Sequence, residues 1–227
     1  GRGRDDEATA ILDETAVSRT VRIAAAAYPF DWFDDLSGYE AKITRWAAEA
    51  ADCDLLVFPE YGAMELASLG GPAIARDLEA SLHEVARHEA ARDAIHARLA
   101  AGHGCHILAA SGPAFPAPGA WPVNRAVLFG PQGRIGHQDK QIMTRFERED
   151  WDVTGAPGLA VFDTPVGRLG ITICYDSEFP LLARRLAEAG AEIILAPSCT
   201  DSVAGFMRVR IGCMARALEN QCVVVQA

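Results

Sequence analysis

The chain has 227 residues, of which 50% are hydrophobic, so it can bury one sizeable core in a single domain. Its formal net charge of −10 argues against binding to nucleic acid or to anionic lipid, since both need clustered Lys and Arg. No apolar run is long enough to span a membrane, and the charged start (residues 1–8) lacks the apolar core of a signal peptide, so we expect a cytoplasmic protein.

Apolar stretches alternate with helical periodicity along the chain, the pattern that predicts an α/β fold. Turn sequences at 130–133 and 164–167 predict two hairpins, so the sheets should be mixed. Ser37 is the expected N-cap of the first helix, and residues 113–122 the expected surface loop near the site. The expected elements are, in order, strand 21–27, a helix through 39–50, strand 55–58, a helical region through 74–99 in one or two pieces, strands 106–110, 125–129, 134–137, 160–163 and 168–173, helix 180–189, strand 192–196, helix 207–218 and strand 222–226.

The six cysteines are not spaced like the pairs of zinc ribbons or redox dithiols, so we expect reduced and mostly buried thiols. The segment 103–106 places two histidines around Cys105. Adjacent strand residues point to opposite faces, however, so Cys105 and His106 cannot readily bind one ion. We therefore expect no metal site.

Three chemically active side chains each follow an apolar strand: Glu60, Lys140 and Cys174. If those strands share a sheet, the three groups meet at the crevice where α/β sheets bind ligands. The thiol can then attack an electron-poor carbon, the carboxylate can move protons, and the ammonium can stabilise an oxyanion. Alone, each residue has an ordinary structural explanation as a core thiol, a helix-start carboxylate or a solvated lysine. Their combination favours catalysis.

Three ordered motifs carry a resemblance: Phe58–Tyr61, Asp139–Glu147 and Ile173–Pro180. Together they resemble the carbon–nitrogen hydrolase (nitrilase) superfamily, amidase-like branch, whose members use a Glu-Lys-Cys triad. The resemblance implies a four-layer α-β-β-α sandwich over residues 21–227, after an N-terminal extension of residues 1–20. Many relatives have His where this chain has Asp139. Members usually continue beyond the point that corresponds to Ala227, so we expect the sequence to lack a C-terminal part of the domain.

The resemblance also implies a second glutamate near the triad. Glu147 matches it best by position and Glu149 is the alternative, although the charged run 145–150 also fits a solvated helix face. Tyr61 and Trp151 are candidates to line a substrate pocket, and so is Thr200, which follows a strand. The backbone N–H of Tyr175 is the expected partner of Lys140 at the oxyanion.

The function implied is hydrolysis of a small amide through a Cys174 thioester, releasing ammonia or an amine, with no metal or organic cofactor. A nitrilase or an N-carbamoyl hydrolase could use the same triad, and an acyltransferase or a catalytically silent binding or scaffold protein could share the fold. The expected partners are a small-molecule amide or nitrile and, from the resemblance, further copies of the chain in a homodimer or a higher homo-oligomer.

Overall fold

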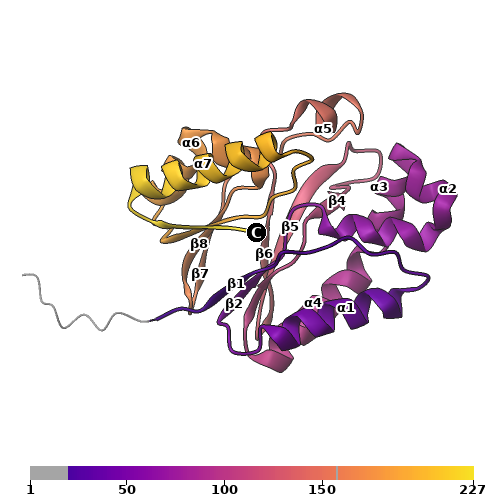
Figure 1. The fold of residues 1–227 in the computed structure, drawn as a ribbon, viewed down its shortest axis with the longest axis horizontal. Helices are drawn as coiled ribbons and strands as arrows, with labels where there is room; N and C mark the ends of the chain where they lie inside the picture. Colours follow the sequence, from indigo (N-terminus) through magenta and orange to yellow (C-terminus); the bar gives the residue numbers. More distant parts are fainter. Residues whose placement is uncertain (1–19, 157) are drawn as a thin grey trace, which may run out of the picture.

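The computed structural model describes residues 20–156 and 158–227. Two sheets pack face to face and helices cover the outer face of each, so the layers run helix, sheet, sheet, helix (Figure 1). The expected α-β-β-α sandwich with mixed sheets is confirmed. The expected N-terminal extension, 1–20, lies outside the described residues except at Thr20.

The first sheet is centred on its longest strand, β5. Strands β1, β2 and β3 run parallel to one another, whereas β3, β4 and β6 each pair antiparallel with β5. The expected hairpin around the turn 130–133 is therefore confirmed as β5–β6. The strands are β1 (Ile23–Ala25), β2 (Leu55–Val57), β3 (His106–Leu108), β4 (Gly112–Ala114), β5 (Val123–Gly130) and β6 (Gly133–Asp139).

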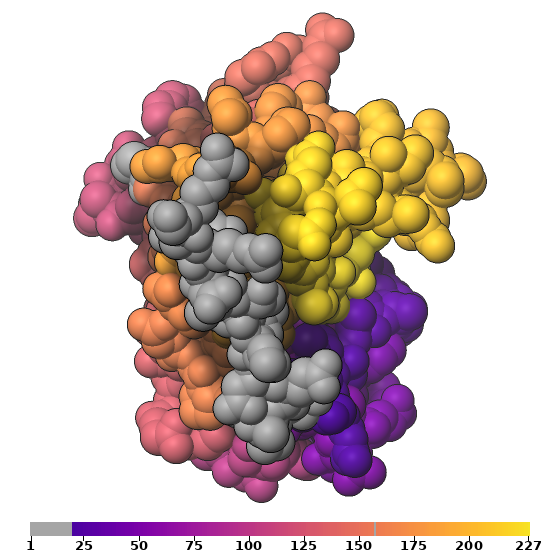
Figure 2. Space-filling view, turned by 90° about the vertical axis from the view of Figure 1, so that its left-hand side faces the viewer, coloured from indigo at the N-terminus to yellow at the C-terminus, as the bar shows by residue number. Residues whose placement is uncertain are grey.

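The second sheet has the strand order β10-β9-β8-β7. Strands β8, β9 and β10 are parallel, and β7 pairs antiparallel with β8 across the expected turn at 164–167. The strands are β7 (Val161–Thr164), β8 (Gly167–Ile171), β9 (Ile193–Ala196) and β10 (Val223–Gln226). Figure 2 shows the C-terminal segment (yellow) beside the start of the first strand (indigo), and Ile23 and Val225 pack in one apolar cluster.

The helices form two outer layers. Helices α1 and α4 cover the first sheet, and α6 and α7 cover the second (Figure 1). In the part of the chain that the structure describes, no helix combines the length and the apolar character that crossing a membrane needs. The helices are α1 (Leu36–Glu49), the 3₁₀ helix η1 (Gly62–Gly70), α2 (Gly71–Arg76), α3 (Leu78–Arg87), α4 (Glu89–His103), α5 (Arg145–Glu149), the 3₁₀ helix η2 (Cys174–Glu178), α6 (Pro180–Glu188) and α7 (Val203–Asn220).

Alternating side chains of the strands fill two kinds of core, one between the two sheets and one between each sheet and its helices. Leu55 and Val57 point into the core between the sheets, whereas Leu56 points toward the α1–α4 layer. In the second sheet, Leu195 faces the inter-sheet core and Ile194 faces α6. Because successive strand residues point to opposite faces, a strand that is apolar throughout must be buried on both sides. This places the carboxyl ends of β2 and β8 at the rim of the same inter-sheet core.

Two local expectations were wrong, and a third was wrong in part. The N-cap of α1 is Asp35, whose carboxylate accepts from the N–H of Gly38, and the Ser37 hydroxyl donates to that carboxylate from inside the first turn. The helical region expected at 74–99 is divided into α2, α3 and α4. The segment expected as a surface loop at 113–122 is a mostly exposed loop over 115–121, but its first two residues belong to β4, which is buried and paired with β5.

Candidate functional site

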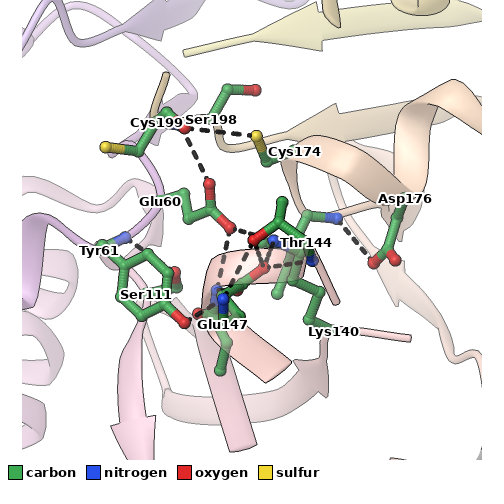
Figure 3. Close-up of polar contacts among 12 residues, drawn as sticks. Glu60, Tyr61, Ser111, Lys140, Thr144, Glu147, Cys174, Asp176, Ser198 and Cys199 are labelled. Atoms are coloured by element: carbon green, nitrogen blue, oxygen red, sulfur yellow. Dashed lines mark hydrogen bonds and ion pairs between the residues drawn. The ribbon is translucent and has the colours of Figure 1, made fainter. Parts of the chain in front are cut away.

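The site forms where strands of both sheets end. Glu60 follows β2 and Lys140 follows β6 in the first sheet, whereas Cys174 follows β8 in the second. The three strands therefore do not share one sheet, contrary to the expectation. The residues meet because the two sheets pack face to face with these strand ends at the same rim (Figure 3).

Lys140 is the centre of the polar network. Its Nζ lies 2.7 Å from Oε1 of Glu60 and 2.6 Å from Oε2 of Glu147, and only 1% of the Lys140 side chain is exposed. Burial alone would lower the pKa of Lys140, but the charges of Glu60 and Glu147 outweigh it and hold that pKa above its ordinary value. The ammonium therefore stays charged between two carboxylates.

Glu60 is fixed at both oxygens. Its Oε1 accepts from Nδ2 of Asn124 at 3.0 Å as well as from Lys140, and its Oε2 accepts from the backbone N–H of Cys199 at 3.1 Å. Burial raises the pKa of Glu60; Lys140 opposes this shift and Glu147 adds to it. A carboxylate with a raised pKa and a fixed orientation is suited to accept and return a proton.

Cys174 sits at a strained turn between β8 and η2. Its φ of +48° is rare for a residue with a side chain, and its N–H donates to the carbonyl of Pro197. The thiol lies 3.6 Å from the carbonyl oxygen of Cys199 and also interacts with Glu60. Burial, then the charge of Glu60, raises the pKa of Cys174, so the thiol is uncharged at rest. It needs a base at the moment it attacks.

Glu147 is held by the start of α5. Thr144 and Glu147 form a capping box, in which the Glu147 N–H donates to Oγ1 of Thr144 and the Thr144 N–H donates to Oε2 of Glu147 at 2.8 Å. Burial opposes ionisation of Glu147, but Lys140 and Thr144 hold its pKa below the ordinary value. Glu149, the alternative second glutamate, lies on the outer face of α5 and pairs with Arg145 and Arg148.

A cavity of about 990 Å³ opens over these groups. Tyr61, Trp151 and Thr200, the residues expected to line a pocket, all line this cavity, and so does Tyr175, whose N–H is the expected oxyanion donor. The hydroxyl of Tyr61 donates to Oε1 of Glu147 at 2.8 Å, and the Tyr61 ring meets Trp151 edge-on at 5.1 Å between centroids. None of residues 113–122 lines it.

Sequence reasoning missed two residues that hold the site together. Asp176 accepts backbone hydrogen bonds from Gln141, Ile142 and Ile173, so it ties the segment after Lys140 to the turn at Cys174. Burial raises the pKa of Asp176 to about 7 against these bonds. Asn124, the second, has no local signal, since it precedes the expected strand 125–129 and belongs to none of the motifs. The order Thr144-x-x-Glu147, in contrast, is a recognisable capping-box sequence.

Comparisons with known proteins identify the family. A family model described as "Carbon-nitrogen hydrolase" matches residues 13–227. The chain is 46% identical over 102 residues to "Probable hydrolase YhcX" of Bacillus subtilis, covering 45% of this chain and 20% of that protein. It is 48% identical over 90 residues to "Deaminated glutathione amidase" of Yersinia enterocolitica, covering 39% of this chain and 30% of that protein. These matches span less than a third of either relative.

Solved structures show the same fold. The crystal structure of a carbon–nitrogen hydrolase from Helicobacter pylori G27 superposes with a TM-score of 0.74 at 19% identity, covering 91% of this chain and 72% of that one. At this identity the similarity concerns the fold alone.

Proposed function

The chain belongs to the carbon–nitrogen hydrolase family, and on that premise we propose that it hydrolyses the C–N bond of a small amide through a thioester on Cys174. The observation that carries the proposal is the ammonium of Lys140 held between Glu60 and Glu147, with the Cys174 thiol beside Glu60. The partial match to a protein named as an amidase supports the amide over other substrates.

In the acylation step, Glu60 takes the thiol proton as the Cys174 sulfur attacks the carbonyl carbon. The oxygen of the tetrahedral adduct gains negative charge near the ammonium of Lys140 and the N–H of Tyr175. Tyr175 is in the first turn of η2, where N–H groups lack acceptors within the helix. Glu60 then gives its proton to the leaving nitrogen, the C–N bond breaks, and ammonia or an amine departs.

In the deacylation step, Glu60 removes a proton from water, whose oxygen attacks the thioester carbon. The C–S bond breaks, the carboxylic acid leaves, and the proton returns to the sulfur. Glu147 has a lowered pKa and stays ionised, so it holds Lys140 in place and keeps it charged while Glu60 changes protonation state. One carboxylate thus exchanges protons and the other keeps a constant charge.

The test is a panel of amides, nitriles and N-carbamoyl compounds scored for ammonia and carboxylic acid. We expect the wild-type protein to release both products from amides, and Cys174→Ala, Glu60→Gln and Lys140→Ala each to lose nearly all turnover with the fold retained by circular dichroism. Glu149→Gln is the matched control and should keep wild-type turnover. Comparable turnover in any triad variant would remove that residue from the mechanism, and no product from any compound would favour a silent binding protein.

We also propose that the protein self-associates through its α6–α7 layer. Five apolar side chains on α7 fall at spacings of three or four residues, which places them on one face, and each is at least 43% exposed. Leu181 of α6 is 76% exposed in the same outer layer. An unburied apolar face of this kind suits a second copy of the chain. The five are Val203, Met207, Ile211, Met214 and Leu218.

Light scattering coupled to size exclusion tests this interface. We expect the wild-type protein to have the mass of a dimer or a higher oligomer, and Ile211→Glu to lower that mass. Ile135→Glu, an exposed position on β6, is the control and should leave the mass unchanged. A monomeric wild-type protein contradicts the interface.

A further inference from the structure

Beyond the reacting groups, the wall of the cavity exposes three large aromatic side chains. Phe30 is 55% exposed, Trp32 54% and Phe146 48%, and all three line the cavity over Cys174. A single exposed aromatic residue is ordinary, but three around one cavity leave a concave apolar surface that a ligand can cover. Phe30 and Trp32 come from the segment between β1 and α1, which runs out toward α2 before it returns (Figure 1).

Most charged side chains of the outer wall have an ion-pair partner, so an anionic substrate would have to displace Glu149 or Glu178 to pair with Arg145 or Arg208. The exception among the described residues is Asp201, for which the structure gives no ion pair, and its negative charge disfavours an anionic ligand. The ion pairs are Asp31 and Glu65 with Lys42, Arg145 with Glu149, and Arg208 with Glu178.

The position of the aromatic wall is fixed by a buried lysine. Lys42 of α1 is 2% exposed, and its Nζ contacts the carboxylate of Glu65, the carbonyl of Pro29 and, at 2.9 Å, Oδ2 of Asp31. Glu65 in turn accepts from the Asp31 N–H at 2.5 Å and from the Tyr28 hydroxyl at 2.6 Å.

On the far side of this segment, the N–H of Phe33 donates to Oγ of Ser68 at 3.1 Å. Hydrogen bonds thus fix the backbone on both sides of Phe30 and Trp32. The two aromatic side chains themselves extend into the cavity. Burying the charge of Lys42 costs free energy unless that charge is paired, and here it is paired with Glu65 and Asp31. The network therefore serves to hold the wall in one position.

We propose that the site selects amides whose acyl group carries an aromatic ring, with Phe30 and Trp32 as specificity-determining residues and Lys42 as their positioning residue. This proposal rests on the proposed amide hydrolysis and names its substrate class. The ring packs against Phe30, Trp32 and Phe146 while the carbonyl carbon lies at Cys174. An acyl group that ends in a carboxylate meets Asp201, and it can pair with Arg145 or Arg208 only by displacing Glu149 or Glu178.

The first experiment compares three amides: 3-phenylpropionamide, propionamide and succinamate. Burying an aromatic ring is worth about 1.5–3 kcal/mol, so kcat/KM for the aromatic amide should exceed that for propionamide by roughly 10–100-fold. Succinamate should be the poorest of the three. Equal rates for the three amides, or a preference for succinamate, would overturn the proposal while leaving amide hydrolysis intact.

The second experiment truncates the aromatic side chains of the cavity wall one at a time. Phe30→Ala and Trp32→Ala should each lower the ratio of kcat/KM for 3-phenylpropionamide to that for propionamide by about tenfold, mainly through KM. Lys42→Met should lower the same ratio. Trp121→Ala is the matched control, because Trp121 is 62% exposed and does not line this cavity, and it should leave the ratio unchanged. An unchanged ratio in both aromatic variants contradicts the assignment.

Binding separates failure of this proposal from failure of the proposed function. Titration of 3-phenylpropionamide into Cys174→Ala, followed by calorimetry, measures affinity without turnover. Weaker binding to the double variant Cys174→Ala/Trp32→Ala than to Cys174→Ala supports the aromatic site even if no amide is hydrolysed. No binding to Cys174→Ala, or equal binding to the two variants, overturns it.

Discussion

At the scale of single residues, the decisive feature is that the pKa values of two buried carboxylates are shifted in opposite directions. Glu60 and Glu147 share Lys140, yet the pKa of Glu60 is raised and that of Glu147 is lowered. The two are equally buried, so the difference follows from their other contacts: Glu147 also accepts hydrogen bonds from the N–H and the hydroxyl of Thr144, which lower its pKa. Carboxylates whose pKa values are pushed apart in this way can divide proton transfer and charge stabilisation between them.

This division predicts a pH dependence. Glu60 must be ionised to act as a base, so activity should be lost as pH falls through its pKa, and the acid limb of kcat/KM should lie above the range of an ordinary glutamate. The charge of Glu147 contributes to raising that pKa, so Glu147→Gln should move the acid limb to lower pH as well as slow turnover. The measurement is kcat/KM against pH for both proteins.

Glu149→Gln is the control, since Glu149 is exposed and pairs with surface arginines. An acid limb that stays in place in Glu147→Gln would mean that the limb reports a group other than Glu60.

At the scale of elements, the strand ends were predicted well and the short helices poorly. The strands before Glu60 and Cys174 are evident from sequence because each is an apolar run that ends in a polar turn, whereas β6, before Lys140, is mostly polar and is marked by the turn at 130–133. Helix α5 has only five residues, too few for helical periodicity, and the charged run that contains it resembles a solvent-exposed face. Only the Thr144–Glu147 capping box marks its start.

Other misses depend on tertiary contacts. Asp35 and Ser37 are both good N-cap residues, and sequence cannot decide between them. Strand β4 contains Gly112 and Pro113, which disfavour strands, and it forms because β5 offers an edge for pairing. The assignment of Glu60 and Cys174 to different sheets follows from the order in which strands pair, which no local pattern encodes.

The packing of α7 on η2 gives a prediction at this scale. A Cβ at Gly212 of α7 would come within 3.1 Å of the carbonyl oxygen of Ser177, so Gly212→Ala should push η2 away from α7 and shift the turn at Cys174 relative to Glu60. We expect at least about a tenfold loss of kcat, because small displacements of a reacting group are costly. Steady-state kinetics measure it.

Gly102→Ala in α4 is the matched control. No atom lies within 4 Å of a Cβ at that position, so the substitution should leave kcat unchanged and stabilise the protein by about 0.5–1 kcal/mol through helix propensity. A wild-type kcat in Gly212→Ala would show that the helix layer does not fix the position of the nucleophile.

At the scale of the whole molecule, the site depends on the packing of one sheet against the other. Leu128 of the first sheet and Ile171 and Leu195 of the second share the inter-sheet core. These contacts set the distance between the rim that carries Glu60 and Lys140 and the rim that carries Cys174. The active arrangement is therefore a property of the folded sandwich, and neither sheet contains it alone.

The deep burial of the charges around Lys140 also determines how the protein should respond to dissolved salt. Lys140, Glu60 and Glu147 are each at most 2% exposed, so mobile ions cannot approach them, and an uncharged amide is neither attracted nor repelled by the surface. Between about 20 and 500 mM NaCl, kcat/KM for an uncharged amide should change less than about twofold. An anionic amide such as succinamate must approach a protein of net charge −10, and its kcat/KM should rise with salt as the repulsion is screened. A strong dependence on salt of kcat/KM for the uncharged amide would mean that Lys140, Glu60 and Glu147 are in contact with bulk solvent.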